Sequence, residues 1–249
     1  MSHTSEIPAS ERYCRQWPVL YEDNHLLALY KPAGLLVQGD ASGRDCLLEL
    51  GKAYLKTKYQ KPGRVFLGLV HRLDYPVAGV VIFARTSKAA ARLSEQFRTG
   101  TLEKCYLAVV YGQPAKSSDR WVDHLLREER VMRVLALPEE GTQEARLRYQ
   151  VIAGDDDHSL VDIFLETGRR HQIRAQFAHR GYAILGDRRY GSPTRFPRGQ
   201  IALLAKVIRF RHPVRAEWLV LEAPLPHGWP WPGSITDASS PPWSWETSS

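Results

Sequence analysis

The sequence has few cysteines and no long apolar run. Its three cysteines, Cys14, Cys46 and Cys105, lie far apart and form no C-x-x-C pair. This spacing gives no support to a zinc ribbon or a thioredoxin-like redox site, so we expect reduced, structural thiols. No segment approaches the roughly 18–20 uncharged apolar residues that cross a bilayer, and residues 1–11 lack the apolar core of a secretion signal. We therefore expect a cytoplasmic protein that does not enter a membrane.

Motifs that bind nucleotides or metals are also absent. The sequence contains no G-x-x-x-x-G-K-[ST] loop, no G-x-G-x-x-G turn after a predicted strand, no H-E-x-x-H and no G-x-S-x-G. Such patterns cradle phosphates, hold zinc or expose a nucleophilic serine. His171 and His179 are eight residues apart with no third ligand nearby, which disfavours a metal site. Any chemistry is expected to need neither a metal nor a cofactor.

What the sequence does have is an ordinary globular composition with unevenly distributed charge. It is 43% hydrophobic and 24% charged, as folded domains usually are. The formal net charge is +7, but residues 169–215 alone carry +11, from twelve Lys or Arg against the single acid Asp187. Such a segment fits a polyanion such as RNA, because phosphate contacts release bound counterions. A solvated basic face without a partner explains the charge equally well.

The chain is expected to form one domain between two loose tails. Residues 1–14 are polar and residues 233–249 are rich in Ser and Pro, so both segments are expected to be flexible. Residues 15–232 contain no long linker and no internal repeat, and their number suits one domain. We expect this domain to be a monomer.

Hydrophobic periodicity predicts more strands than helices. Apolar residues near 3.6 spacing indicate a helix over 45–59, and Thr86 or Ser87 is placed to cap a second helix that ends before Gly100. A third, short helix is predicted over 170–180. Apolar or alternating runs predict strands at 26–30, 35–37, 65–70, 80–84, 104–111, 120–126, 144–153, 160–166, 201–210 and 217–222. Because strands and helices do not alternate, the pattern indicates an α+β fold with a mixed, largely antiparallel sheet flanked by helices and loops.

Four segments contain most of the residues that could take part in catalysis or binding. One of them lies in a polar loop between two predicted strands, where functional residues are often found. In chain order they are Lys31-Pro32-Ala33-Gly34-Leu35, then His71-Arg72-Leu73-Asp74, then Lys104-Cys105-Tyr106-Leu107-Ala108, and finally Thr167-Gly168-Arg169-Arg170-His171-Gln172-Ile173-Arg174, which is followed by Gly186-Asp187-Arg188-Arg189-Tyr190-Gly191.

Each segment also has a purely structural interpretation. Asp74 could form a local ion pair with Arg72, and Tyr106 could be a packed strand aromatic. Arg170 and Arg174 are four residues apart on the predicted helix and would share one face. That face could be solvated or could bind RNA phosphate. The residues alone leave these alternatives open.

Together and in this order, the segments resemble the motifs of the RluA-type family of ribosomal and transfer RNA pseudouridine synthases. The resemblance covers roughly residues 19–224, almost the whole predicted domain. It implies the catalytic fold of these enzymes and an isomerase that converts a specific uridine in structured rRNA or tRNA to pseudouridine. A non-catalytic RNA-binding protein that retains the fold is the alternative.

The resemblance also assigns roles to individual residues. Asp74 stands at the position of the essential carboxylate, Arg174 at that of the arginine paired with it, and Tyr106 at that of the tyrosine packed against the target base. Arg72 stands where relatives have a residue implicated in filling the space left by the flipped base. Other residues of the second and fourth motifs are expected to contact RNA or the base, namely His71, Arg169, Arg170 and His171.

The sequence departs from the family pattern in three respects. Val77 and Ala78 stand where many relatives have Thr and Ser, which removes two hydroxyls but leaves the carboxylate. Gln38 stands where a histidine is frequent. Too few residues precede His25 for the small N-terminal RNA-binding domain that many relatives carry. We therefore expect that domain to be absent and RNA choice to rest on the catalytic domain.

Overall fold

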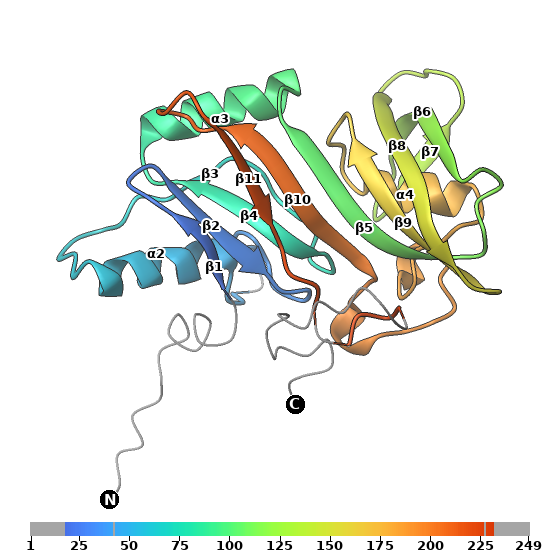
Figure 1. Cartoon of the computed structure of the whole chain (residues 1–249), viewed down its shortest axis with the longest axis horizontal. Coiled ribbons are helices and arrows are strands. Elements are labelled where there is room, and N and C mark those ends of the chain that lie inside the picture. Colours follow the sequence, from blue (N-terminus) through green and yellow to red (C-terminus); the bar gives the residue numbers. More distant parts are fainter. Residues whose placement is uncertain (1–17, 42, 227, 232–249) are drawn as a thin grey trace, which may run out of the picture.

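The computed structural model describes residues 18–41, 43–226 and 228–231 (Figure 1). The predicted tails, 1–14 and 233–249, lie outside these residues. No helix in the described ranges is long and apolar enough to cross a membrane. The helices are α2 (Leu47–Lys58), α3 (Ser87–Thr99) and α4 (Gln172–His179), with 3-10 turns at Arg188–Tyr190 and Pro197–Gly199.

The described strands form one mixed sheet. They are β1 (Val19–Glu22), β2 (Leu26–Lys31), β3 (Gly68–Leu69), β4 (Ala78–Ala84), β5 (Glu103–Tyr111), β6 (Ser118–Arg127), β7 (Met132–Leu135), β8 (Gln143–Gly154), β9 (His158–Leu165), β10 (Leu203–Arg211) and β11 (Trp218–Glu222). The main path runs β1-β2-β4-β10-β5-β9-β8-β6-β7, while β3 pairs with β4 and β11 with β10. Only β4 and β10 run parallel among these pairs, which confirms the predicted α+β class.

Strands β2 and β4 are buried because helices cover both of their faces (Figure 1). Leu27 and Leu29 of β2 belong to one apolar cluster with Leu47 of α2. Leu26 of the same strand joins a larger cluster that contains Leu93 of α3. Successive side chains of a strand point to opposite faces, so one continuous apolar run contributes to two cores.

The ends of α3 match the signals predicted from the sequence. The Thr86 side chain accepts a hydrogen bond from the Ala89 N–H at 3.2 Å, and Gly100 closes the helix in the left-handed conformation with a φ of 68°. These local contacts explain why sequence alone located both ends.

The predicted helix over 170–180 begins later than expected. The structure starts α4 at Gln172, and His171 before it has a φ of 51°, in the left-handed region. Arg170 therefore lies outside the helix and does not share a helical face with Arg174. The amphipathic pattern continued through 170–171, but the backbone conformation at His171 interrupts it.

The second predicted strand, over 35–37, is wrong, because the chain there wraps around a buried lysine. Lys31 Nζ donates hydrogen bonds to the carbonyl oxygens of Pro32, Leu35 and Tyr75 at 3.0, 2.8 and 3.1 Å. Leu36 keeps only an isolated bridge. These bonds tie the first motif to Tyr75, the residue that follows Asp74, so Lys31 braces the loop that carries the carboxylate.

The remaining differences between the predicted and the observed strands concern short strands. The strand predicted over 65–70 is reduced to the two residues of β3, while β1 and β7, each four residues long, were not predicted. Segments of this length contain too few positions for a period of two to stand out. Their pairing depends on neighbours that are distant in the sequence.

The register of the sheet brings the start of β4 close to Tyr106. Gly79 of β4 pairs with Ala205 of β10, which in turn pairs with Tyr106 of β5, so the three residues lie in one row. Gly79 has a φ of 132°, and a Cβ there would lie 2.3 Å from the Ala205 carbonyl oxygen. Only glycine allows this approach. The loop before β4, which carries Asp74, is thereby held beside Tyr106.

Candidate active site

Two carboxylates share one buried arginine. Arg174 Nη1 donates to Asp74 Oδ2 at 3.0 Å, and its Nε and Nη2 donate to the two carboxylate oxygens of Asp187 at 2.6 and 2.9 Å. The side chains of Arg174 and Asp187 are 4% and 1% exposed, whereas that of Asp74 is 28% exposed. Burial lowers the pKa of Arg174, but the hydrogen bonds and charges of the carboxylates outweigh it and raise that pKa overall. The guanidinium is therefore a fixed cation.

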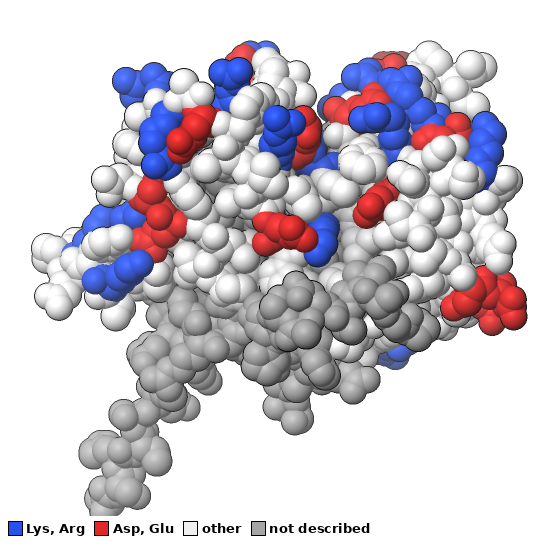
Figure 2. Space-filling model, in the orientation of Figure 1, with Lys and Arg blue, Asp and Glu red and all other residues white. Residues whose placement is uncertain are grey.

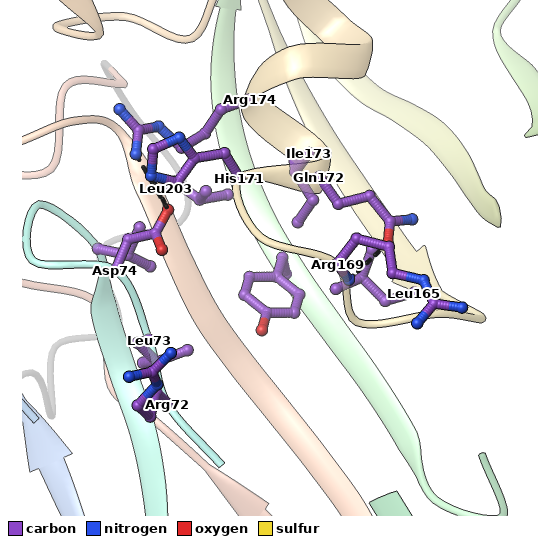
Figure 3. Close-up of a pocket in the computed structure, with 12 residues that line it drawn as sticks. Arg72, Leu73, Asp74, Leu165, Arg169, His171, Gln172, Ile173, Arg174 and Leu203 are labelled. Carbon is purple, nitrogen blue, oxygen red and sulfur yellow. Dashed lines mark hydrogen bonds and ion pairs between the residues drawn. The ribbon is translucent and has the colours of Figure 1, made fainter. Parts of the chain in front are cut away.

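The Asp74 carboxylate is engaged through one oxygen. Oδ2 accepts from Arg174 and lies 3.6 Å from Nε2 of His171, while Oδ1 has no hydrogen-bond partner in the described part of the chain. Figure 3 shows Arg174 and His171 on the same side of this carboxylate. An anchored carboxylate with one open oxygen is suited to act as a nucleophile or a base.

Tyr106 projects from β5 into a cavity of about 80 Å³ beside Asp74. Burial raises the pKa of the Tyr106 hydroxyl above its ordinary value, and the Asp74 charge adds to the shift, so the hydroxyl stays protonated. The cavity brings together six of the residues predicted from the sequence, which are Asp74, Arg174, Tyr106, Arg72, Arg169 and His171.

A larger cavity, of about 840 Å³, adjoins the first and shares Arg72, Asp74, His171 and Arg174 with it. Its lining includes eight arginines, Arg72, Arg127, Arg170, Arg174, Arg188, Arg189, Arg195 and Arg198, and we call it the arginine groove. The two acidic residues that line it, Asp74 and Asp187, are both bound by Arg174. By contrast, basic and acidic side chains are interspersed on the face drawn in Figure 2.

Arg72 and Arg169 flank the small cavity in different ways. Arg72 is exposed, and no hydrogen bond or ion pair joins it to Asp74 in the structure, so the simple local ion pair is not present. Arg169 is anchored, because its Nε donates to the Glu144 carbonyl oxygen at 2.9 Å. Arg72 is therefore free to move when a ligand binds, whereas the Arg169 side chain is held at the edge of the small cavity by its hydrogen bond.

His71 lines neither cavity, in contrast to the expectation that it contacts RNA or the base. Its Nε2 accepts a hydrogen bond from the Ile82 N–H at 2.9 Å, and its ring stacks on Phe97 of α3 with centroids 4.6 Å apart. Burial, assisted by the nearby Lys104 charge, lowers the pKa of His71 to about 3. The structure thus gives His71 a supporting position behind the loop.

Acid should destabilise the protein through His71. The folded state keeps this imidazole neutral, while the unfolded chain takes up a proton below its ordinary pKa of 6.5, so stability falls as pH drops from 6.5 towards 3. The loss is at most about 1.4 kcal/mol per pH unit. In His71→Gln the amide oxygen can still accept from Ile82 but does not titrate. The free energy of unfolding, measured with urea at several pH values in this range, should fall less steeply with decreasing pH in the variant than in wild type. His179→Gln, at an exposed histidine, is the control, and equal pH dependence in His71→Gln and wild type would contradict this account.

The substitutions at the expected Thr-Ser pair are buried. Val77 and Ala78 are 3% and 1% exposed and belong to the main apolar cluster, and Val77 also lines the small cavity. The apolar side chains therefore pack where hydroxyls would need hydrogen-bond partners. The loop keeps its shape through the Val77 N–H, which donates to the Asp74 carbonyl oxygen at 3.1 Å.

Two residues of the site had no role assigned from the sequence. Asp187 binds Arg174 through both oxygens, and Tyr190 places its hydroxyl 2.9 Å from His171 Nδ1. Both belong to the Gly186–Gly191 segment, whose resemblance to the family motif was the available signal. Within the described residues, no group of three or more His, Cys, Asp or Glu is placed to hold a metal ion.

Comparison with known proteins identifies the family. Residues 25–179 match the model of the family described as RNA pseudouridylate synthase, and the chain belongs to this family. The RluA-type resemblance of the motifs is confirmed by relatives named ribosomal large subunit pseudouridine synthase D, from Xanthomonas campestris pv. campestris, and C, from Vibrio parahaemolyticus. These are 34% identical over 223 residues and 33% identical over 214 residues.

A further relative is named tRNA pseudouridine synthase C, from Pectobacterium carotovorum, and is 30% identical over 245 residues. The three alignments cover 84%, 83% and 90% of this chain and 66%, 65% and 62% of the relatives, so the chain spans about two thirds of their length. Among solved structures, human RNA pseudouridylate synthase domain containing 4 aligns with a TM-score of 0.73 at 23% identity, covering 87% of this chain and 91% of that one. This likeness shows the fold.

Proposed function

We propose that the protein is an RNA pseudouridine synthase, which isomerises a specific uridine of structured rRNA or tRNA with Asp74 as its catalytic carboxylate. The observation that carries this proposal is the anchored Asp74 carboxylate, which faces a cavity shared with Tyr106 and adjoining the arginine groove. Relatives named for both ribosomal and transfer RNA support the substrate class. We also expect a monomer in the cytoplasm.

The proposed chemistry rearranges a single nucleotide. The bond from uracil N1 to ribose C1′ breaks, the uracil turns, and a bond forms from C5 to C1′. C5 loses its proton to solvent and N1 gains one, so the composition is unchanged and neither an oxidant nor a cofactor is required. Asp74 must be ionised, whether it attacks the sugar or removes a ribose proton. The Arg174 guanidinium holds this carboxylate in place through its hydrogen bond to Oδ2.

The arginine groove supplies the binding energy in this proposal. A uridine within folded RNA must leave its stack to reach the small cavity, at a cost of a few kcal/mol. Arginines of the groove, such as Arg188 and Arg189, are placed to contact phosphates on either side of the extruded nucleotide. Arg72, exposed at the mouth of the cavity, would occupy the space that the base leaves.

Tyr106 is proposed to stack against the uracil while it turns. Tyr106→Phe should then keep most of the turnover, because the ring remains, whereas Tyr106→Ala should lose about 1–3 kcal/mol of base stacking. Single-turnover rates with the two variants measure this difference. Equal losses in both would assign the contribution to the hydroxyl instead of the ring.

Tritium release tests the proposed function directly. RNA labelled with tritium at uracil C5 is prepared from a strain that lacks the gene, so that its sites are unmodified. The full-length protein should release tritium from this RNA, and it should release none from free labelled uridine. RNA binding without any release would favour the alternative, a non-catalytic RNA-binding protein that retains the fold.

A further inference from the structure

His171 occupies an unusual backbone position between the two cavities. It lies directly before α4 with a φ of 51° and a ψ of 20°, a conformation uncommon for residues that carry a side chain. The residue is buried, at 8% exposure, and lines both the small cavity and the arginine groove. This conformation turns the imidazole towards Asp74 (Figure 3).

The Tyr190 hydroxyl contacts one of the two imidazole nitrogens of His171. The Tyr190 hydroxyl oxygen accepts a hydrogen bond from the Met132 N–H at 2.8 Å and lies 2.9 Å from His171 Nδ1. Burial raises the pKa of this hydroxyl, so it keeps its proton. Within the described residues, the acceptor in reach of this hydroxyl proton is His171 Nδ1; donation to Nδ1 leaves the imidazole hydrogen on Nε2. That Nε2–H faces Asp74 Oδ2 at 3.6 Å.

We propose that His171 is a positioning residue for the catalytic carboxylate, and that the Tyr190 hydroxyl fixes it in the tautomer that presents Nε2–H to Asp74. Arg174 and His171 both face Oδ2, so Oδ1 remains available to contact the ribose. The 3.6 Å separation is just beyond a hydrogen bond, and such contacts commonly tighten when substrate closes the site. This inference rests on the proposed function.

The imidazole acts as a neutral donor. Burial lowers the pKa of His171 to about 4; the Asp74 charge opposes this shift, and the Arg174, Arg170 and Arg189 charges reinforce it. The imidazole is therefore uncharged near neutral pH. The contribution of His171 is one directed N–H.

Tyr190→Phe tests the contact between the Tyr190 hydroxyl and His171 with a minimal change. The ring remains, packed edge-on against His171 and beneath the Arg174 guanidinium, while the hydroxyl is lost. Single-turnover rates with tritium-labelled total RNA, at saturating protein, should fall about tenfold or more. The protein concentration at half-saturation should stay unchanged. Tyr182→Phe is the matched control, because the Tyr182 hydroxyl also accepts one backbone N–H, from Ala115 at 3.1 Å, away from the site.

His171→Asn separates positioning from folding. Asn, like His, is among the residues that adopt the left-handed conformation most readily, so the variant should keep the local backbone and remain folded in the absence of denaturant. Its rate should still fall, because Asp74 Oδ2 loses the N–H that faces it, while the protein concentration at half-saturation should stay unchanged. A folded variant with the wild-type rate would overturn the proposal.

Nitrogen-15 NMR of the free protein examines the tautomer without any RNA. Wild type should show His171 with a protonated Nε2 and a bare Nδ1, and Tyr190→Phe should show a mixture of tautomers. An Nδ1–H tautomer in wild type would overturn this inference while leaving the proposed function intact. Absence of tritium release from wild type would instead refute the proposed function, and this inference with it.

Discussion

Asp74→Asn is expected to abolish turnover while RNA binding persists. The amide has nearly the shape of the carboxylate, and its oxygen can still accept from Arg174 Nη1, so the loop should keep its structure. The variant lacks the negative charge that either mechanism requires. Loss of an essential nucleophile or base typically lowers the rate on the order of 10⁴-fold or more. Single-turnover tritium release measures this loss.

Binding provides the internal control for Asp74→Asn. Its affinity for RNA should equal that of wild type or exceed it slightly, because one negative charge beside the arginine groove has been removed. Asp157→Asn, at an exposed loop carboxylate, should leave both rate and affinity unchanged. A rate within a fewfold of wild type for Asp74→Asn would remove Asp74 from the mechanism.

Arg174→Lys is expected to damage turnover more than binding. Lysine keeps the positive charge, but its single ammonium cannot reproduce the three hydrogen bonds that the guanidinium makes to Asp74 and Asp187. Asp74 should therefore lose its fixed orientation, and misplacement of a reacting group by about 1 Å lowers rates about 10²-fold. A pure loss of affinity would mean that Arg174 acts only as a phosphate contact.

A second pair of variants separates the structural part of Arg174 from its effect on Asp74. Arg174→Met should lower the free energy of unfolding by about 3–5 kcal/mol, because it strands the buried Asp187 carboxylate without a partner. Adding Asp187→Asn removes that stranded charge and should restore part of the stability without restoring the rate. Arg180→Lys, at the more exposed ion pair with Asp123, is the matched control for Arg174→Lys.

The parts of the fold that local signals determine were predictable from the sequence. The caps of α3 at Thr86 and Gly100 act within one turn, and the apolar runs of β2 and β4 identify strands without further information. The start of α4 was not predictable in this way. Its boundary depends on the conformation of His171, whose ring is held by Tyr190, 19 residues away in the chain.

In the candidate site, too, contacts between residues distant in the sequence could not be predicted from local patterns. Asp74 and Arg174 were paired only through family resemblance, because 100 residues separate them and no local pattern encodes their contact. The bidentate bond from Arg174 to Asp187, and the contact of Tyr190 with His171, emerged only when the chain was folded. His71 was predicted to touch RNA because it shares a motif with Asp74, yet its imidazole points to the backbone of β4. Membership of a motif did not indicate the direction of the side chain.

The most direct test of the central claim is a pseudouridine map at single-nucleotide resolution. Total RNA from a strain that lacks the gene is incubated with the full-length protein or with Asp74→Asn, and every modified position is compared. We predict one or a few positions in rRNA or tRNA that are modified by wild type and untouched by the variant. A map without any new pseudouridine, obtained with protein that binds the RNA, would contradict the assignment, and identical maps from the two proteins would contradict the role of Asp74.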